Sequence, residues 1–119
     1  MGTGKRMGKP KRFDAIDHIA IPVKDISQAV DWYTSTFKCS VEYQDETWAY
    51  LNFTNIKLAL VVPGEHPGHI AFAVDNASQY GQLVAHRDGT RSIYVKDPAG
   101  NSVELVEKSS IKAIQAKDS

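Results

Sequence analysis

One strand-like segment occurs twice in this chain, and this repeat limits the possible folds more than any other feature. The segment HIAIPVKD occupies residues 18–25 and HIAFAVDN occupies residues 69–76, so the second copy begins 51 residues after the first. In each copy, large apolar side chains alternate with small or polar ones, which is typical of a strand buried on one face. A histidine opens each copy on the other face. Because so short a repeat cannot bury a core alone, the two copies must pack as paired units.

The segments after each copy also follow a common order. In the first unit, apolar residues at helical spacing predict a helix that runs to about residue 37, and the second unit has a shorter helical pattern at about 77–85. Alternating or β-rich runs then predict strands in both units, at 40–44, 47–53, 56–62, 91–95 and 102–107. The order is therefore β-α-β-β-β, followed by β-α-(β)-β-β, with room for at most a short second strand in the second unit.

The spacing of the closing strands shows that the second unit is shorter. Residues 57–62 and 102–107 are 45 residues apart, whereas the opening strands are 51 apart. We therefore predict an α+β fold of two tandem βαβββ modules, at 14–63 and 68–107, joined by the loop PGEHPG. Residues 1–13 are expected to be a disordered basic tail, and residues 108–119 a C-terminal tail.

Composition excludes several classes of function. The 119 residues are 42% hydrophobic and 24% charged, with a formal net charge of zero, as in ordinary soluble globular proteins. Five of the 14 basic residues lie within residues 1–12, which leaves an acidic body without a basic aromatic surface for nucleic acid. The absence of a long apolar run argues against a membrane span. Cys39 is the single cysteine, so no intramolecular disulfide is possible, and a cytoplasmic location is expected.

Three residues form a candidate metal site. His18 and His69 open equivalent strands, and Glu104 interrupts the otherwise apolar closing strand on the face opposite Val103 and Leu105. Two histidines and one carboxylate are the ligands of a facial triad, which leaves metal positions open for substrate. Such a set suits Fe, Mn, Ni, Co or Zn as divalent ions. By spacing alone, a strand histidine is more often structural and a strand glutamate more often solvated, so both alternatives stay open.

Three segments carry a resemblance to a known family. DHIAIPVKDISQAVDWYTSTF, GHIAFAVDN and IYVKDPAGNSVELVE are similar to the vicinal oxygen chelate superfamily, which includes glyoxalase I, extradiol dioxygenases, thiol transferases and bleomycin-binding proteins. The resemblance covers about residues 14–107. It implies paired modules that form a curved mixed sheet around a metal cavity. It also implies metal ligands at His18, His69 and Glu104.

The resemblance implies further site residues without selecting one activity. Glyoxalase I has a fourth ligand at the position of Ala59, so strict glyoxalase I activity is not expected. Similarity to extradiol dioxygenases implies catalytic roles for Glu104, for Tyr94 and for His86, the last two as hydrogen-bond donors to a bound oxygen. Similarity to the thiol transferases makes four residues partial candidates for an anion cluster, of which we select the first for substrate binding: Arg91, Ser92, Tyr94 and Lys96.

Two aromatic residues are also candidates for substrate binding. Trp48 and Tyr50 share one face of a strand and can stack on a planar substrate, although packing against a second subunit is an equal alternative. The sequence thus predicts a small metal-dependent enzyme, a glyoxalase-like lyase, dioxygenase or thiol transferase. Its alternative is a binding protein of the bleomycin-resistance type without turnover. We further expect a homodimer whose sites combine His18 of one chain with His69 and Glu104 of the other.

Overall fold

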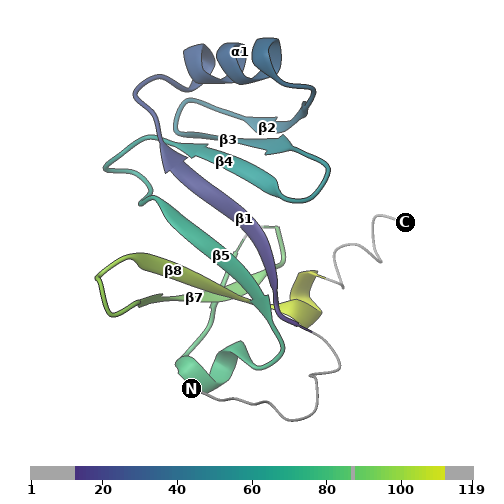
Figure 1. Ribbon diagram of the computed structural model, residues 1–119. Coiled ribbons are helices and arrows are strands. Elements are labelled where there is room, and N and C mark those ends of the chain that lie inside the picture. The colour runs from purple at the N-terminus through teal and green to yellow at the C-terminus, as the bar shows by residue number, and fades with distance from the viewer. Residues whose placement is uncertain (1–12, 87, 112–119) are drawn as a thin grey trace.

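The computed structural model describes residues 13–86 and 88–111, which form one curved mixed sheet with a single long helix on its outer side (Figure 1). The α+β fold predicted from the sequence is confirmed. The eight strands lie in the order β2-β3-β4-β1-β5-β8-β7-β6. The elements are β1 Ala15–Pro22, α1 Ile26–Thr36, β2 Ser40–Gln44, β3 Trp48–Asn52, β4 Lys57–Val61, β5 His69–Val74, the 3-10 helix η2 Ala77–Tyr80, β6 Val84–Ala85, β7 Arg91–Lys96 and β8 Ser102–Glu107.

The strand register reproduces the repeat found in the sequence. The opening strands β1 and β5 are antiparallel neighbours at the centre of the sheet, and each pairs in parallel with the closing strand of its own half. In the first half, Ala20 is the register partner of Ala59; in the second half, Ala71 is the partner of Glu104. These pairs are related by the predicted offsets of 51 and 45 residues. Ala59 and Glu104 are therefore equivalent positions.

Helix α1 covers the outer face of the first half. Asp25 caps its first turn, since Oδ1 accepts a hydrogen bond from the Gln28 backbone N–H at 3.0 Å. The helix buries Ile26 and Val30 against Leu51 and Leu60, which have no solvent exposure. This packing removes branched apolar side chains of the first half from water, and that burial is the main source of its stability.

Only the beginning of the helix predicted at about 77–85 is helical. The chain instead forms η2, a single 3-10 turn that ends at Gly81, followed by the two-residue strand β6. Gly81 has φ +144°, and a Cβ at this position would lie 2.5 Å from Cδ1 of Ile93. Because only glycine adopts this backbone conformation so close to β7 without strain, the helix cannot continue through Gly81.

Small side chains line the inner face of the central strands. Ala20, Ala59, Ala71 and Ala73 are all buried, each on one of the central strands of the sheet. Trp48 and Tyr50 pack against the cluster that contains Ala20 and Ala59, so aromatic rings cover part of this face. No helix within residues 13–86 and 88–111 has both the length and the apolarity needed to cross a bilayer.

The two predicted tails lie mostly outside the described residues. Phe13 is 77% exposed, and residues 1–12 and 112–119 are not described. Residues 108–111 continue from β8 in helical conformation, and Ser110 is buried there.

Candidate metal centre

Strand register brings the predicted triad together above the central strands. His18 on β1 is the partner of Ala71 on β5, and Ala71 is the partner of Glu104 on β8, so these three residues form one row across the sheet. His69 lies on β5 beside Ala20. The methyl group of Ala71 is too short to separate the side chains on either side of it. His18 and Glu104 can therefore reach each other above β5.

The three candidate ligand atoms lie at the corners of a small triangle. Nε2 of His18 is 3.2 Å from Nε2 of His69 and 3.4 Å from Oε1 of Glu104, and the last side, from His69 Nε2 to Glu104 Oε1, is 3.0 Å. Two ligand atoms that are each about 2.1 Å from one ion and about 90–110° apart are separated by about 3.0–3.4 Å. The donor set and its spacing therefore fit a divalent metal ion.

Outer partners hold both imidazole rings with Nε2 directed at the triangle. Nδ1 of His18 lies 2.9 Å from Oδ2 of Asp17 and 2.7 Å from the hydroxyl of Tyr50. Nδ1 of His69 donates to the backbone carbonyl of Pro67 at 2.9 Å. Hydrogen bonds of this kind fix the tautomer that presents Nε2 to a metal, and they are the usual support of metal-binding histidines.

Asp17 is a site residue that strand alternation did not predict. A regular strand would direct Asp17 away from His18, because successive side chains point to opposite faces. The pairing of β1 with β5 shifts between Ile16 and His18, however, and this irregularity lets the Asp17 carboxylate contact the His18 ring. The one sign in the sequence that Asp17 could contact the ring was its position directly before a candidate ligand histidine.

Glu104 is held from its other side by β7 and the loop before it. Its Oε2 accepts a hydrogen bond from the Ser92 hydroxyl at 2.7 Å, and Ser92 Oγ in turn lies 2.7 Å from Nε2 of His86. His86 Nε2 is 3.9 Å from the same carboxylate oxygen. His86 therefore lies beside Glu104 and reaches it mainly through Ser92, and the catalytic role that the resemblance implies for it stays a prediction.

The electrostatics of the metal-free centre are those of a buried ion pair. Burial acts to lower the pKa of His18, but hydrogen bonds to Asp17 and Glu104 outweigh it and raise that pKa to about 9. Burial acts to raise the pKa of Glu104. Hydrogen bonds from His18, His69 and Ser92 outweigh burial, so the pKa of Glu104 is well below the usual range. A proton thus occupies the centre at neutral pH when no metal is bound.

The aromatic candidates lie on the same face as the triad. Tyr50 stacks edge-on to His18 with ring centroids 5.3 Å apart, and Trp48 lies 5.1 Å from Tyr50. On the opposite side, the Tyr94 ring lies 5.1 Å from that of His69. Burial and the negative charge of Glu104 raise the pKa of Tyr94, which therefore keeps its proton at neutral pH.

Two expectations from the sequence do not agree with this geometry. Arg91 is exposed on β7 and alternates with Ser92, so it lies on the face away from the triad, and the structure does not bring it to the site. The sequence also predicts a site shared by two chains, whereas here a single chain supplies His18, His69 and Glu104 with all three atoms within 4.8 Å of one another.

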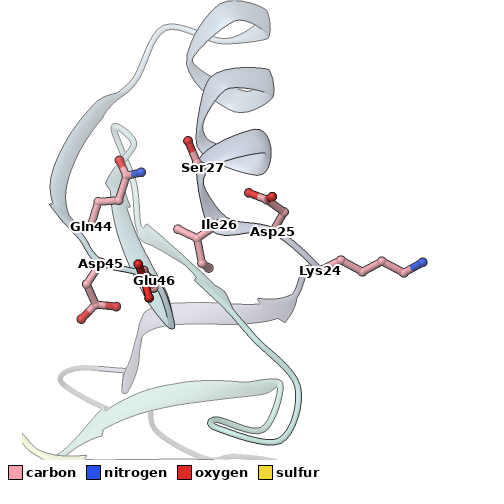
Figure 2. Close-up of a pocket in the computed structure, with 7 residues that line it drawn as sticks. All are labelled: Lys24, Asp25, Ile26, Ser27, Gln44, Asp45 and Glu46. Atoms are coloured by element: carbon pink, nitrogen blue, oxygen red, sulfur yellow. The ribbon is translucent and has the colours of Figure 1, made fainter.

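A groove at the start of α1 is separate from the triad. Figure 2 shows its lining residues, which come from the first turn of α1 and from the end of β2: Lys24, Asp25, Ile26, Ser27, Gln44, Asp45 and Glu46. The Asp25 carboxylate caps the helix, and Asp45 accepts hydrogen bonds from Thr47 and Trp48. These two carboxylates serve the local backbone, and the chemistry of the chain is concentrated at the triad instead.

Comparisons with known proteins agree with this fold. No curated protein matches the chain in sequence. A hypothetical protein from Bacillus halodurans C-125 is 20% identical with a TM-score of 0.63, over 82% of this chain and 96% of that chain. A glyoxalase/bleomycin resistance protein/dioxygenase superfamily member from Vibrio splendidus 12B01 is 13% identical with a TM-score of 0.59, over 80% and 99%. Methylmalonyl-CoA epimerase from Mycobacterium tuberculosis is 18% identical with a TM-score of 0.55, over 78% and 87%.

The match to a family model is more specific than these structural likenesses, which at such identities show the fold alone. The model described as Glyoxalase/Bleomycin resistance protein/Dioxygenase superfamily matches residues 15–105. That range includes nearly all of both modules, both candidate histidine ligands and Glu104. With its two-module sheet and its inward-facing triad, the chain belongs to the Glyoxalase/Bleomycin resistance protein/Dioxygenase superfamily.

Proposed function

We propose that this chain is a metal-dependent enzyme whose divalent ion is held by His18, His69 and Glu104. The observation that carries the proposal is the convergence of two Nε2 atoms and one carboxylate oxygen, 3.0–3.4 Å apart, with each Nδ1 held by an outer partner. When bound, the ion would act as a Lewis acid on two neighbouring oxygens of a small substrate. Fe, Mn, Ni, Co and Zn all accept these ligands, and the chain does not select among them.

The surrounding residues have separate roles in this proposal. Tyr50 and Asp17 orient the His18 ring. Trp48 offers an aromatic surface on the same face. The protonated Tyr94 is suited to donate a hydrogen bond to a substrate oxygen that gains negative charge. Arg91 has no role, because it lies on the other face.

The reaction is proposed only as a class. Lyase, dioxygenase and thiol-transfer reactions all stabilise negative charge on an oxygen bound by the metal. Strict glyoxalase I activity does not fit, because the buried Ala59 occupies the register position equivalent to Glu104 and has no ligand atom. The alternative is a sequestering protein that binds a small molecule in the same space without turnover. A metal ion found at the triad with positions open for substrate would favour the enzyme over the sequestering protein.

The assembly and location are proposals of the same kind. We propose a homodimer, supported by partly exposed apolar side chains such as Ile16 and Ile70, which are 43% and 39% exposed. Dimerisation is not needed to complete the metal centre, because one chain contains the whole triad. A cytoplasmic location remains the expectation from the single cysteine.

The metal proposal is tested with protein purified without chelator. We expect about one divalent ion per chain by elemental analysis, and His18→Ala or Glu104→Ala should abolish tight binding. His66→Ala is the matched control, since His66 lies in the loop before β5 and is not part of the triad. If both triad variants retain the affinity of the parent, the centre is wrongly assigned. Assays with catechols after anaerobic loading with Fe(II), and with the glutathione–methylglyoxal adduct after loading with Ni(II) or Zn(II), then separate the reaction classes.

A further inference from the structure

Ser92 is a polar side chain in a position where a strand would normally bury an apolar one. It lies on β7 at 1% exposure, facing the same side of the sheet as Glu104. A buried hydroxyl is costly unless it is hydrogen-bonded, and an apolar residue would avoid that cost. A local role in the metal centre accounts for a serine at this position better than packing does.

The hydrogen-bond directions around Ser92 follow from the chemistry of its neighbours. An ionised carboxylate can only accept, so the hydroxyl proton of Ser92 must be donated to Oε2 of Glu104 at 2.7 Å. The hydroxyl has no second proton, so Nε2 of His86 must donate to Ser92 Oγ, also at 2.7 Å. His86 thereby fixes the orientation of the Ser92 hydroxyl, and Ser92 fixes one oxygen of Glu104.

The two oxygens of Glu104 consequently have different environments. Oε1 faces the two imidazoles, 3.4 Å from Nε2 of His18 and 3.0 Å from Nε2 of His69. Oε2 is directed at Ser92 and His86 instead. A carboxylate that binds a metal through both oxygens must turn both toward the ion, and the hydrogen bond from Ser92 opposes this by holding Oε2 in its present direction.

We propose that Ser92 is a positioning residue that reserves Oε2 and makes Glu104 a single-oxygen metal ligand. This inference rests on the proposed metal-dependent function. A glutamate that binds through one oxygen leaves an additional metal position open compared with one that binds through two. The substrate class proposed above needs two open positions, one for each of its neighbouring oxygens. At a five-coordinate ion, three ligands that each bind through one atom leave these two positions open, and a second Glu104 oxygen would occupy one of them.

The experiment compares Ser92→Ala with the parent, both loaded with Co(II). Three quantities are measured: Co(II) affinity, the d–d absorption of the bound ion, and affinity for acetohydroxamate, a chelator with two neighbouring oxygens. We expect Ser92→Ala to weaken Co(II) binding by about 10-fold or more, as loss of an outer-shell hydrogen bond to a ligand usually does. The d–d spectrum should change, and acetohydroxamate binding should also weaken by about 10-fold, because the freed oxygen competes for its position.

Ser110→Ala is the matched control for loss of a buried serine hydroxyl. Ser110 is also 1% exposed, and within the described part of the chain its hydroxyl bonds backbone groups alone, the Arg91 N–H at 3.1 Å and the Glu107 carbonyl at 2.6 Å. This variant should keep the parent's Co(II) spectrum and both affinities. If Ser92→Ala also keeps all three, the positioning role is overturned. A parent protein that binds no Co(II) would instead overturn the metal centre itself.

A second variant keeps the test decisive if Ser92→Ala does not fold. His86 is 37% exposed in its side chain, so His86→Ala should fold while removing the donor that orients Ser92. We expect a change in the d–d spectrum in the same direction and a smaller loss of acetohydroxamate affinity, about 3-fold. An unchanged spectrum and affinity in His86→Ala would overturn the proposed chain from His86 through Ser92 to Glu104.

Discussion

The two halves of the molecule share a strand order but differ in what covers their outer faces. In the first half, α1 spans 11 residues and lies over Leu60, which has no exposure. In the second half, the equivalent element is η2, a single turn of four residues, and the equivalent leucine, Leu105, is 9% exposed. Both hydrophobic clusters found among the described residues consist of side chains from the first half.

The inner face shows the opposite distribution. The second half supplies His69 and Glu104, together with Ser92 and His86, whereas the first half supplies His18 with its orienting partners. One copy of the repeat has thus kept the larger core, and the other carries most of the polar network. Buried polar and charged groups cost stability unless they are fully paired. No buried side-chain nitrogen or oxygen in the described residues lacks a hydrogen-bond partner, so the polar network of the second half meets this condition.

The largest expected effect comes from truncating the equivalent leucines. Leu60→Ala removes a side chain enclosed by α1 and β3 and should lower the free energy of unfolding by about 2–5 kcal/mol. Leu105→Ala should cost at least about 1 kcal/mol less, because the shorter η2 leaves fewer contacts and the site can relax. Urea unfolding of both variants in the presence of chelator measures the difference. Equal losses would show that the two outer faces are packed equally well.

The second prediction concerns the charge interaction that joins the halves. His18 has a pKa raised to about 9 in the folded protein, partly by Glu104 from the other half. A raised pKa means that the folded state holds the proton more tightly than the unfolded state, whose histidine titrates near 6.5. The stabilisation is therefore fully present below about pH 6.5 and is lost as pH rises through about 9. Since one pKa unit corresponds to about 1.4 kcal/mol, the loss is at most about 3.5 kcal/mol.

The comparison that checks it uses chelator-treated protein at pH 6.5 and pH 9.5. The parent should lose stability between these values, and His18→Ala should lose clearly less, because the group responsible is absent. Metal-loaded parent should also resist the rise in pH, since the ion replaces the proton. If the parent and His18→Ala respond equally to pH in chelator, the interaction between His18 and Glu104 does not contribute to folding.

The repeat made much of this architecture predictable. Offsets of 51 and 45 residues were sufficient to make Ala59 equivalent to Glu104, and strand alternation placed His18 and His69 on the inner face. These inferences succeed because period and register are set by local geometry and by burial of one face. Arg91 and Tyr94 are three positions apart in one strand, so alternation directs their side chains to opposite faces. That signal placed Arg91 on the outer face and should have excluded it from the site.

Other features depend on contacts that the sequence does not reveal. The contact between Asp17 and His18 needs a local shift in the pairing of β1 with β5, which no simple period encodes. The early end of η2 at Gly81 depends on the close approach of Ile93 from β7. The completeness of the triad within one chain depends on β1 pairing with β5 of the same molecule. Pairing with a second copy would satisfy the same local rules.

The smallest expected effect concerns the side chains that cap α1 and η2 at their first residues. The Asp25 side chain caps α1 through the Gln28 N–H, so Asp25→Ala should lower stability by about 1 kcal/mol. The corresponding residue before η2, Asn76, makes no side-chain capping bond. The first N–H of η2, that of Ala77, is instead bound at 3.0 Å by Glu107 Oε1 from β8. Asn76→Ala should therefore change stability by less than about 0.5 kcal/mol.

Thermal and urea unfolding of the two variants, measured side by side, test this difference in capping. A loss in Asn76→Ala as large as that in Asp25→Ala would mean that η2 depends on its own cap as α1 does. The second half would then be stabilised locally, in the same way as the first. A small effect of Asn76→Ala, combined with a larger one for Glu107→Gln, would instead show that η2 is held by the sheet. The start of η2 would then depend on β8, the strand that also carries Glu104 to the metal centre.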